Sequence, residues 1–111
     1  MKATNRTVEN VEIITLQGKI TIGAGDTQLR EVITNAVNSG KLNILLDLSG
    51  VTTIDSSGIG ELVGSYTTVT NRGGKLKLLH LPEKLNELLH VTQLITVFEV
   101  YDNEEEAIRS F

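Results

Sequence analysis

The stretch Leu42–Leu48, LNILLDL, is soon followed by TIDSSGIG, Thr53–Gly60, and these two segments decide the fold. The first segment is short, nearly continuous in apolar residues and free of glycine and proline, which is typical of a strand covered on both faces. The second segment leads into an apolar pattern at helical spacing, formed by Ile59, Leu62, Val63, Tyr66 and Val69. A buried strand followed directly by an amphipathic helix indicates an α/β fold.

The N-terminal part of the chain predicts two strands and a helix. VEIITL (residues 11–16) has the pattern of a strand, and the residues before it can pair with it through a turn at Glu9-Asn10. Glycines in residues 18–25 predict a loop, and a helix then follows behind a cap at Asp26 or Thr27. We therefore expect an antiparallel strand pair at the N-terminus, followed by the first helix.

The C-terminal part predicts two more strands and two more helices. Residues 75–81 form a third apolar strand, and Pro82 fits the first position of a short helix. VFEVY (residues 97–101) supplies a last strand, after which Asp102 or Asn103 caps a terminal helix. Strands that alternate with helices predict parallel pairing. The chain should therefore form a mixed, mostly parallel sheet of about five strands with about four helices.

The composition indicates one domain over residues 1–111. Hydrophobic residues make up 40% and charged residues 22%, which excludes a disordered tail, and no apolar run is long enough to cross a membrane. The first ten residues lack the apolar stretch of a secretory signal, and the chain has no cysteine. We expect a cytoplasmic protein. A net charge of -4 without clustered lysine and arginine argues against nucleic-acid binding.

The segment Asp55–Gly60 should lie beyond the carboxyl end of the central strand, where α/β sheets gather functional groups. The free N–H groups of a helix start and its dipole form a binding site for an anion such as phosphate.

Gly58–Gly64 departs from the dinucleotide motif because its third glycine comes one residue late, so we expect no cofactor. His80 and His90 lie at the ends of predicted elements, which favours neither a hydrolase nor a metal site.

Asp55 is predicted to cap the second helix by accepting the N–H of Ser57 or Gly58. Capping does not explain Gly58 and Gly60, because each glycine costs a helix about 0.8–1 kcal/mol relative to alanine. A stripe at helical spacing, which we expect to be more exposed than the apolar face, is formed by Ser56, Gly60, Gly64 and Thr67.

This stripe has two interpretations. In the first, the bare backbone at Gly60 and Gly64 lets a partner protein approach the helix closely. In the second, the same glycines let the helix pack tightly on a neighbouring element of this chain. A phosphoryl group at the helix start would be tolerated by the chain, since the dipole and free N–H groups offset repulsion from Asp55. A docked partner would not tolerate the added charge of about -1.5 to -2. The motif therefore suits a binary switch, and spacing alone does not choose between Ser56 and Ser57.

LLDLSGVTTIDSSGIGELVGSYTTVTNRGGKLKLLHL (residues 45–81) resembles the STAS domain of bacterial anti-sigma-factor antagonists, in which a strand ends in Asp-Ser-[Ser/Thr]-Gly-[Leu/Ile]-Gly before a helix. The resemblance extends more weakly over nearly the whole chain and implies that fold. In that family the serine directly after the aspartate is the phosphoacceptor, here Ser56. The resemblance implies that the unphosphorylated domain binds an anti-sigma factor that is also a serine kinase, which frees a sigma factor. The resemblance also implies that phosphorylation releases the domain and that a serine phosphatase resets it.

One segment departs from the family. Many members carry Gly-Glu-Leu-Asp before the first helix, whereas this chain reads Gly18-Lys19-Ile20-Thr21, in a loop that contributes to partner recognition there. We expect a non-catalytic module, monomeric when free, whose partner surface comprises Thr21, Asp55, Ser57, Gly58, Ile59, Gly60, Gly64 and Thr67 around Ser56. The alternatives are a scaffold in a stress-signalling or transport assembly without a phospho-switch, and a small enzyme or nucleotide-binding protein stabilised by its ligand.

Overall fold

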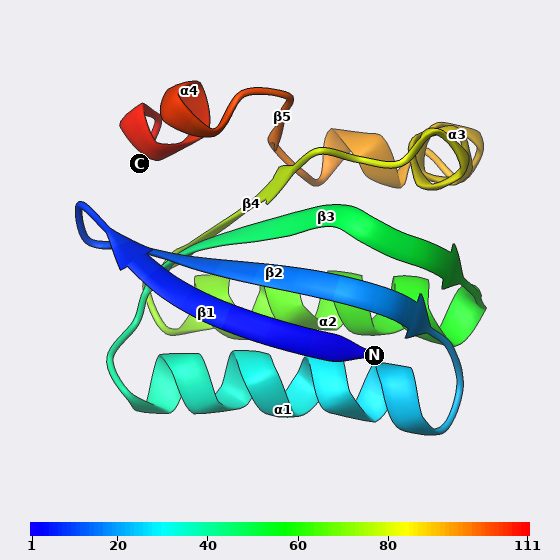
Figure 1. Ribbon diagram of the computed structural model, residues 1–111, viewed down its shortest axis with the longest axis horizontal. Coiled ribbons are helices and arrows are strands. Elements are labelled where there is room, and N and C mark those ends of the chain that lie inside the picture. Colours follow the sequence, from blue (N-terminus) through cyan, green and yellow to red (C-terminus); the bar gives the residue numbers. More distant parts are fainter.

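The computed structural model describes residues 1–111 and contains one five-stranded sheet (Figure 1). The strands follow one another across the sheet in chain order: β1 (Lys2–Val8), β2 (Val11–Ile20), β3 (Asn43–Ile54), β4 (Lys75–Leu79) and β5 (Val100–Tyr101). β1 is antiparallel to β2, and the other neighbouring strands are parallel. The predicted mixed sheet with an antiparallel start is confirmed.

Four α-helices accompany the sheet, as predicted: α1 (Ala24–Asn38), α2 (Ser56–Asn71), α3 (Glu83–Val91) and α4 (Glu104–Arg109). A short 3-10 turn, Leu94–Thr96, follows α3. Figure 1 shows α1 and α2 side by side against one face of the sheet and α4 on the opposite side. β3 lies at the centre of the sheet and leads directly into α2.

The core consists of two apolar clusters, one on each face of the sheet. The larger cluster lies between the sheet and α1, α2 and α3, and its strand residues include Ile14, Leu16, Ile44, Leu46, Leu48 and Leu78. The smaller cluster joins the opposite face to α4 through Val11, Ile13, Leu45, Leu79 and Ala107. Alternate residues of β3 enter both clusters, so the continuous apolar run in this strand is covered on both sides.

Two strands are longer than the sequence predicts. β2 ends at Ile20 instead of residue 16, and β3 ends at Ile54 instead of Leu48. Their extensions pair with each other, so that Ile20 lies opposite Ile54, with register shifts around Gly18. This long-range pairing overrides the local glycine signals. The predicted loop over residues 18–25 shrinks to residues 21–23, and both strands end at the same edge.

The predicted cap of the first helix is wrong. α1 begins at Ala24 after Gly23, whose φ of 103° requires glycine, and no side chain caps this helix. Asp26 and Thr27 lie within its first turn, where the Asp26 N–H donates to the Thr21 carbonyl at 3.1 Å. The turn at Glu9-Asn10 is confirmed, and both of its residues have positive φ, as a tight hairpin requires.

The C-terminal boundaries also differ from the prediction. β4 ends at Leu79 instead of residue 81, and Pro82 precedes α3 instead of occupying its first position. Of the strand predicted over residues 97–101, only Val100–Tyr101 pairs with β4, because residues 97 and 98 form a turn and a bend directly after the 3-10 turn. Asn103, one of the two predicted caps of α4, accepts the N–H of Glu106 at 3.0 Å.

Candidate functional site

Asp55 joins β3 to α2 at the carboxyl edge of the sheet. Its backbone is extended, and its Oδ1 accepts the N–H of Gly58 at 2.9 Å. Asp55 therefore caps α2 as predicted. Of the two predicted donors, Ser57 and Gly58, it is Gly58 that donates its N–H to the carboxylate. The cap satisfies one of the N–H groups that a helix start leaves without an internal partner.

The second oxygen of the same carboxylate binds a segment far away in the chain. Asp55 Oδ2 accepts the backbone N–H of Ile22 at 2.9 Å, while the Asp55 N–H donates to the Ile20 carbonyl at 3.4 Å. The N–H of Ile22 lowers the pKa of Asp55, and the N–H of Gly58 adds to this effect. The carboxylate is therefore ionised at neutral pH, and it ties the loop of residues 21–23 to the start of α2.

The two serines after Asp55 differ in accessibility. Ser56 is the first residue of α2 and is exposed, whereas Ser57 is half-buried. An external protein reaches the Ser56 hydroxyl more readily. Burial thus distinguishes two hydroxyls that spacing alone could not.

The glycines of α2 fall into two kinds. A Cβ on Gly58 would lie 2.1 Å from the Ile20 carbonyl oxygen, so the helix can meet the end of β2 only because this residue has no side chain. A Cβ on Gly60 or Gly64 would meet no atom within 4 Å. Tight packing within the chain therefore explains Gly58 and is excluded as the reason for Gly60 and Gly64.

Gly60 and Gly64 face a shallow groove between α1 and α2. The groove has a volume of about 350 Å³ and is lined by Arg30, Ile33, Thr34, Gly60, Glu61, Gly64, Ser65 and Thr68. Arg30 Nε donates to Glu61 Oε1 at 3.0 Å between the two helices, and this contact raises the pKa of Arg30. Gly60 lies one helical turn from Ser56, so the open side of α2 begins at the candidate phosphoacceptor.

The other predicted contact residues are distributed unevenly. Thr67 is exposed and Thr21 is half-buried, whereas Gly58 and Ile59 are buried and face the chain's own core. Ile22 was not among the predicted contact residues, although its exposure of 75% makes it one of two exposed large hydrophobic residues. The only local signal was an isoleucine beside the glycines of a predicted loop.

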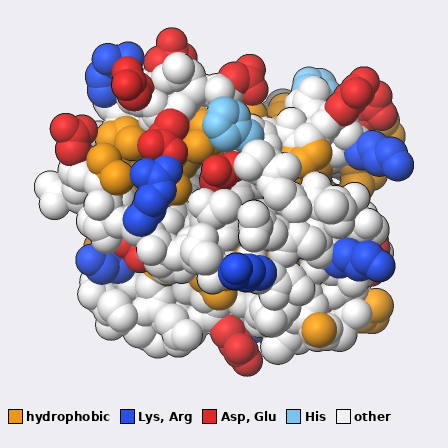
Figure 2. All heavy atoms as spheres, in the orientation of Figure 1, with side chains coloured by type: hydrophobic (Ala, Val, Ile, Leu, Met, Phe, Trp, Pro, Cys, Tyr) orange, Lys and Arg blue, Asp and Glu red, His pale blue; other side chains and the backbone are white.

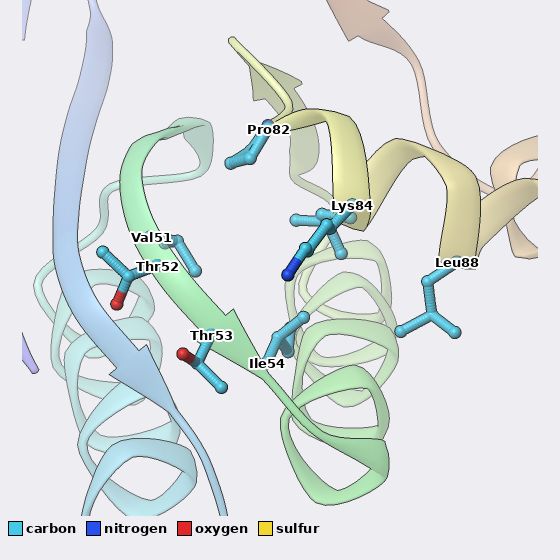
Figure 3. A pocket seen from close by; sticks show the side chains of 8 residues that line it. Val51, Thr52, Thr53, Ile54, Pro82, Lys84 and Leu88 are labelled. Carbon is cyan, nitrogen blue, oxygen red and sulfur yellow. The ribbon is translucent and has the colours of Figure 1, made fainter.

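A second groove of about 280 Å³ lies between the last residues of β3 and α3 (Figure 3). Val51 and Ile54 of β3 extend toward Lys84 and Leu88 of α3. The space exists because pairing between β3 and β4 ends at Asp47, so the rest of β3 has a strand neighbour on one side only. Lys84 is the one charged residue among those that line this groove.

The surface offers no group of three or more histidine, aspartate or glutamate side chains placed to hold a metal ion. Figure 2 shows basic and acidic side chains interspersed over one face, without a continuous basic patch. None of the helices combines the length and the apolar character needed to cross a bilayer.

Known proteins share this sequence pattern and this architecture. The family model of the STAS domain matches residues 2–107 of this chain. An anti-sigma-B factor antagonist of Bacillus subtilis is 28% identical over 101 residues, which cover 91% of each chain. An anti-sigma F factor antagonist of Paenibacillus polymyxa is 30% identical over 66 residues, which span 60% of this chain and 56% of that protein.

Solved structures agree with these sequence matches. A candidate anti-sigma factor antagonist from Thermotoga maritima superimposes with a TM-score of 0.89 at 26% identity, covering 97% of this chain and 92% of its own. SpoIIAA in its unphosphorylated form shares the fold with a TM-score of 0.74 at 22% identity, covering 98% of this chain and 96% of its own. With its mixed five-stranded sheet and a family match over almost its whole length, the chain belongs to the STAS domain family.

Proposed function

We propose that this chain is an anti-sigma factor antagonist that works as a phosphorylation-switched binding module. When Ser56 is unphosphorylated, the chain binds an anti-sigma factor that is also a serine kinase, and a sigma factor is released. The observation that carries this proposal is the exposed Ser56 at the first position of α2, next to the bare backbone of Gly60. The names of the relatives and the known phosphorylated form of SpoIIAA support it.

The chemistry of the switch is a phosphoryl transfer from ATP held by the kinase. The Ser56 Oγ attacks the γ-phosphorus, the bond to the β,γ-bridging oxygen breaks, ADP leaves, and the hydroxyl proton passes to a base of the kinase. The helix dipole and the free N–H groups of the first turn favour negative charge at this position. The phosphorylated chain therefore keeps its fold, although Asp55 lies next to the new charge.

Release of the partner follows from the shape of the surface. The proposed contact surface comprises the loop of residues 21–23, Ser56, Ser57, Gly60, Gly64 and Thr67, with the ionised Asp55 orienting the loop and capping α2. Gly60 and Gly64 leave room for a partner's side chains in the groove beside α1. A phosphate at one end adds bulk and about -1.5 to -2 charges to this contact. Gly58 and Ile59 support the surface from below.

The remaining parts of the proposal concern how the module operates. It acts by binding and without a cofactor, as one domain over residues 1–111 that is monomeric when free and works in the cytoplasm. A serine phosphatase removes the phosphate and resets the cycle. Addition of ATP, GTP or NAD should therefore leave the melting temperature of the chain unchanged. A nucleotide-binding protein would instead gain about 2.7 kcal/mol in its free energy of unfolding at a ligand concentration 100 times Kd.

The test is affinity capture with three immobilised proteins: wild type, Ser56→Ala and Ser56→Asp. A lysate of the source bacterium is passed over each, and bound proteins and the state of Ser56 are determined by mass spectrometry. We expect an ATP-binding serine kinase on wild type and Ser56→Ala, and its loss from Ser56→Asp. Equal recovery on all three, with Ser56 unmodified, would instead identify the chain as a constitutive scaffold.

A further inference from the structure

Ile22 is an apolar side chain presented to solvent beside the candidate phosphoacceptor. It is 75% exposed, in the short connection between β2 and α1. Its backbone nitrogen lies 2.9 Å from Asp55 Oδ2, and Asp55 immediately precedes Ser56. Isolated exposed hydrophobic residues are common on soluble proteins. The position of Ile22 at this site is what requires an explanation.

Both polar groups of the peptide bond between Thr21 and Ile22 are hydrogen-bonded within the chain. The Ile22 N–H is held by Asp55, and the Thr21 carbonyl accepts the N–H of Asp26 at 3.1 Å. In the first turn of α1, a Cβ on Gly25 would lie 2.2 Å from the Lys19 carbonyl oxygen, so α1 begins in direct contact with the end of β2. The loop therefore has a defined conformation in which the Ile22 side chain points away from the core.

We propose that Ile22 is an apolar anchor that enters a hydrophobic pocket next to the catalytic cleft of the kinase that phosphorylates Ser56. This assignment rests on the proposed function. Asp55 binds Ile22 and precedes Ser56, so a protein that encloses the Ser56 hydroxyl also covers the surface around Ile22. A side chain presented in one conformation loses little conformational freedom on binding, and a few residues that fill well-packed, desolvated pockets contribute most of the affinity of an interface.

The chemistry of the loop indicates what kind of partner surface would bind it. Thr21 is uncharged and Gly23 has no side chain, so Ile22 is the large group that residues 21–23 offer to a partner. A matching partner surface supplies an apolar pocket at this point. Burial of isoleucine is favourable enough to account for a tenfold or larger difference in affinity.

The test compares Ile22→Ser with Val91→Ser. Val91 is the other exposed large hydrophobic residue, 81% exposed on α3, and serves as the matched control. The probe is the purified kinase recovered with the wild-type chain. Calorimetry gives its Kd for each variant, with Ile22→Val included because it keeps most of the apolar surface. Thermal unfolding verifies that every variant is folded.

We expect Ile22→Ser to raise Kd about tenfold or more, Ile22→Val to raise it less, and Val91→Ser to change it less than twofold. Wild-type affinity in Ile22→Ser, together with lost binding by Ser56→Asp, would reject the anchor and leave the switch intact. Weak binding by Ile22→Ser with wild-type affinity in Ser56→Asp would reject the switch and retain the anchor. If wild type binds no kinase, both proposals are wrong.

Discussion

Asp55 Oδ2 lies 2.9 Å from the backbone nitrogen of Ile22, although 33 residues separate the two in the chain. The other oxygen of the same carboxylate caps α2 through Gly58 at 2.9 Å. One side chain thus connects the helix start that carries Ser56 with the loop that presents Ile22. A change at Asp55 should therefore affect both segments.

Asp55→Asn should separate these two roles. Asparagine is as good a helix cap as aspartate, but it has one side-chain acceptor oxygen where the carboxylate has two. With that oxygen on Gly58, the amide group of asparagine turns a donor toward the Ile22 N–H. We expect the Ile22 amide to exchange with solvent about tenfold faster and the Gly58 amide to change little. Hydrogen exchange followed by NMR measures both, and unchanged Ile22 exchange would show that the carboxylate does not hold the loop.

The contribution of Asp55 to stability should depend on pH in one direction. Its pKa is lowered in the folded chain from the ordinary value of 3.8, chiefly by the N–H of Ile22. Between the two pKa values the unfolded chain binds more protons, so stability from this group rises with pH. The contribution is complete above about pH 3.8 and disappears as the pH falls through the folded value. Urea unfolding at several pH values should show the difference between wild type and Asp55→Asn shrinking below that pH.

Gly58→Ala and Gly60→Ala should have opposite effects on stability. The new methyl group on Gly58 would collide with the Ile20 carbonyl, and forcing it into place should cost about 1–3 kcal/mol. Gly60 is exposed with free space around it, so alanine should stabilise the helix by up to about 0.8–1 kcal/mol. Equilibrium urea unfolding of the two variants decides the matter. Equal destabilisation by both would contradict the division of the glycines into two kinds.

Gly60→Leu should weaken the partner contact and leave the fold intact. A leucine side chain would project into the groove between α1 and α2, where it would meet no other part of the chain. It would, however, fill space that the side chains of a docked partner occupy. We expect a loss of affinity for the kinase of about tenfold or more. Thr70→Leu is the matched control, because Thr70 is exposed near the far end of the same helix. Similar affinities for the two variants would place the interface elsewhere.

Much of the fold could be predicted from local patterns. The buried run in β3 and the apolar stripe of α2 are strong periodic signals, and they correctly placed the central strand and the helix behind it. The ends of β2 and β3 were not predictable in this way, because residues around Gly18 and Gly50 resemble loops. They remain extended because the two strands pair with each other, which is a tertiary effect.

The site was predictable to a similar degree. The cap by Asp55 depends on neighbouring residues and was predicted, whereas the bond from Ile22 joins distant parts of the chain and left no local trace. The sequence also grouped Gly58 with Gly60, since both cost helix stability. Only the packing of α2 on the end of β2 separates them. The exposure of Ile22 likewise depends on where the strands end.

The most direct test of the switch is the affinity of the kinase for the chain before and after phosphorylation. The chain is phosphorylated by the purified kinase and ATP, the modified residue is located by mass spectrometry, and Kd is measured for both forms. Ser57→Ala should still accept phosphate, and Ser56→Ala should not. We predict phosphate on Ser56 and an affinity about a hundredfold lower, because the new charge lies within the contact. Equal affinity of the two forms, or phosphate on another residue, would contradict the proposed mechanism.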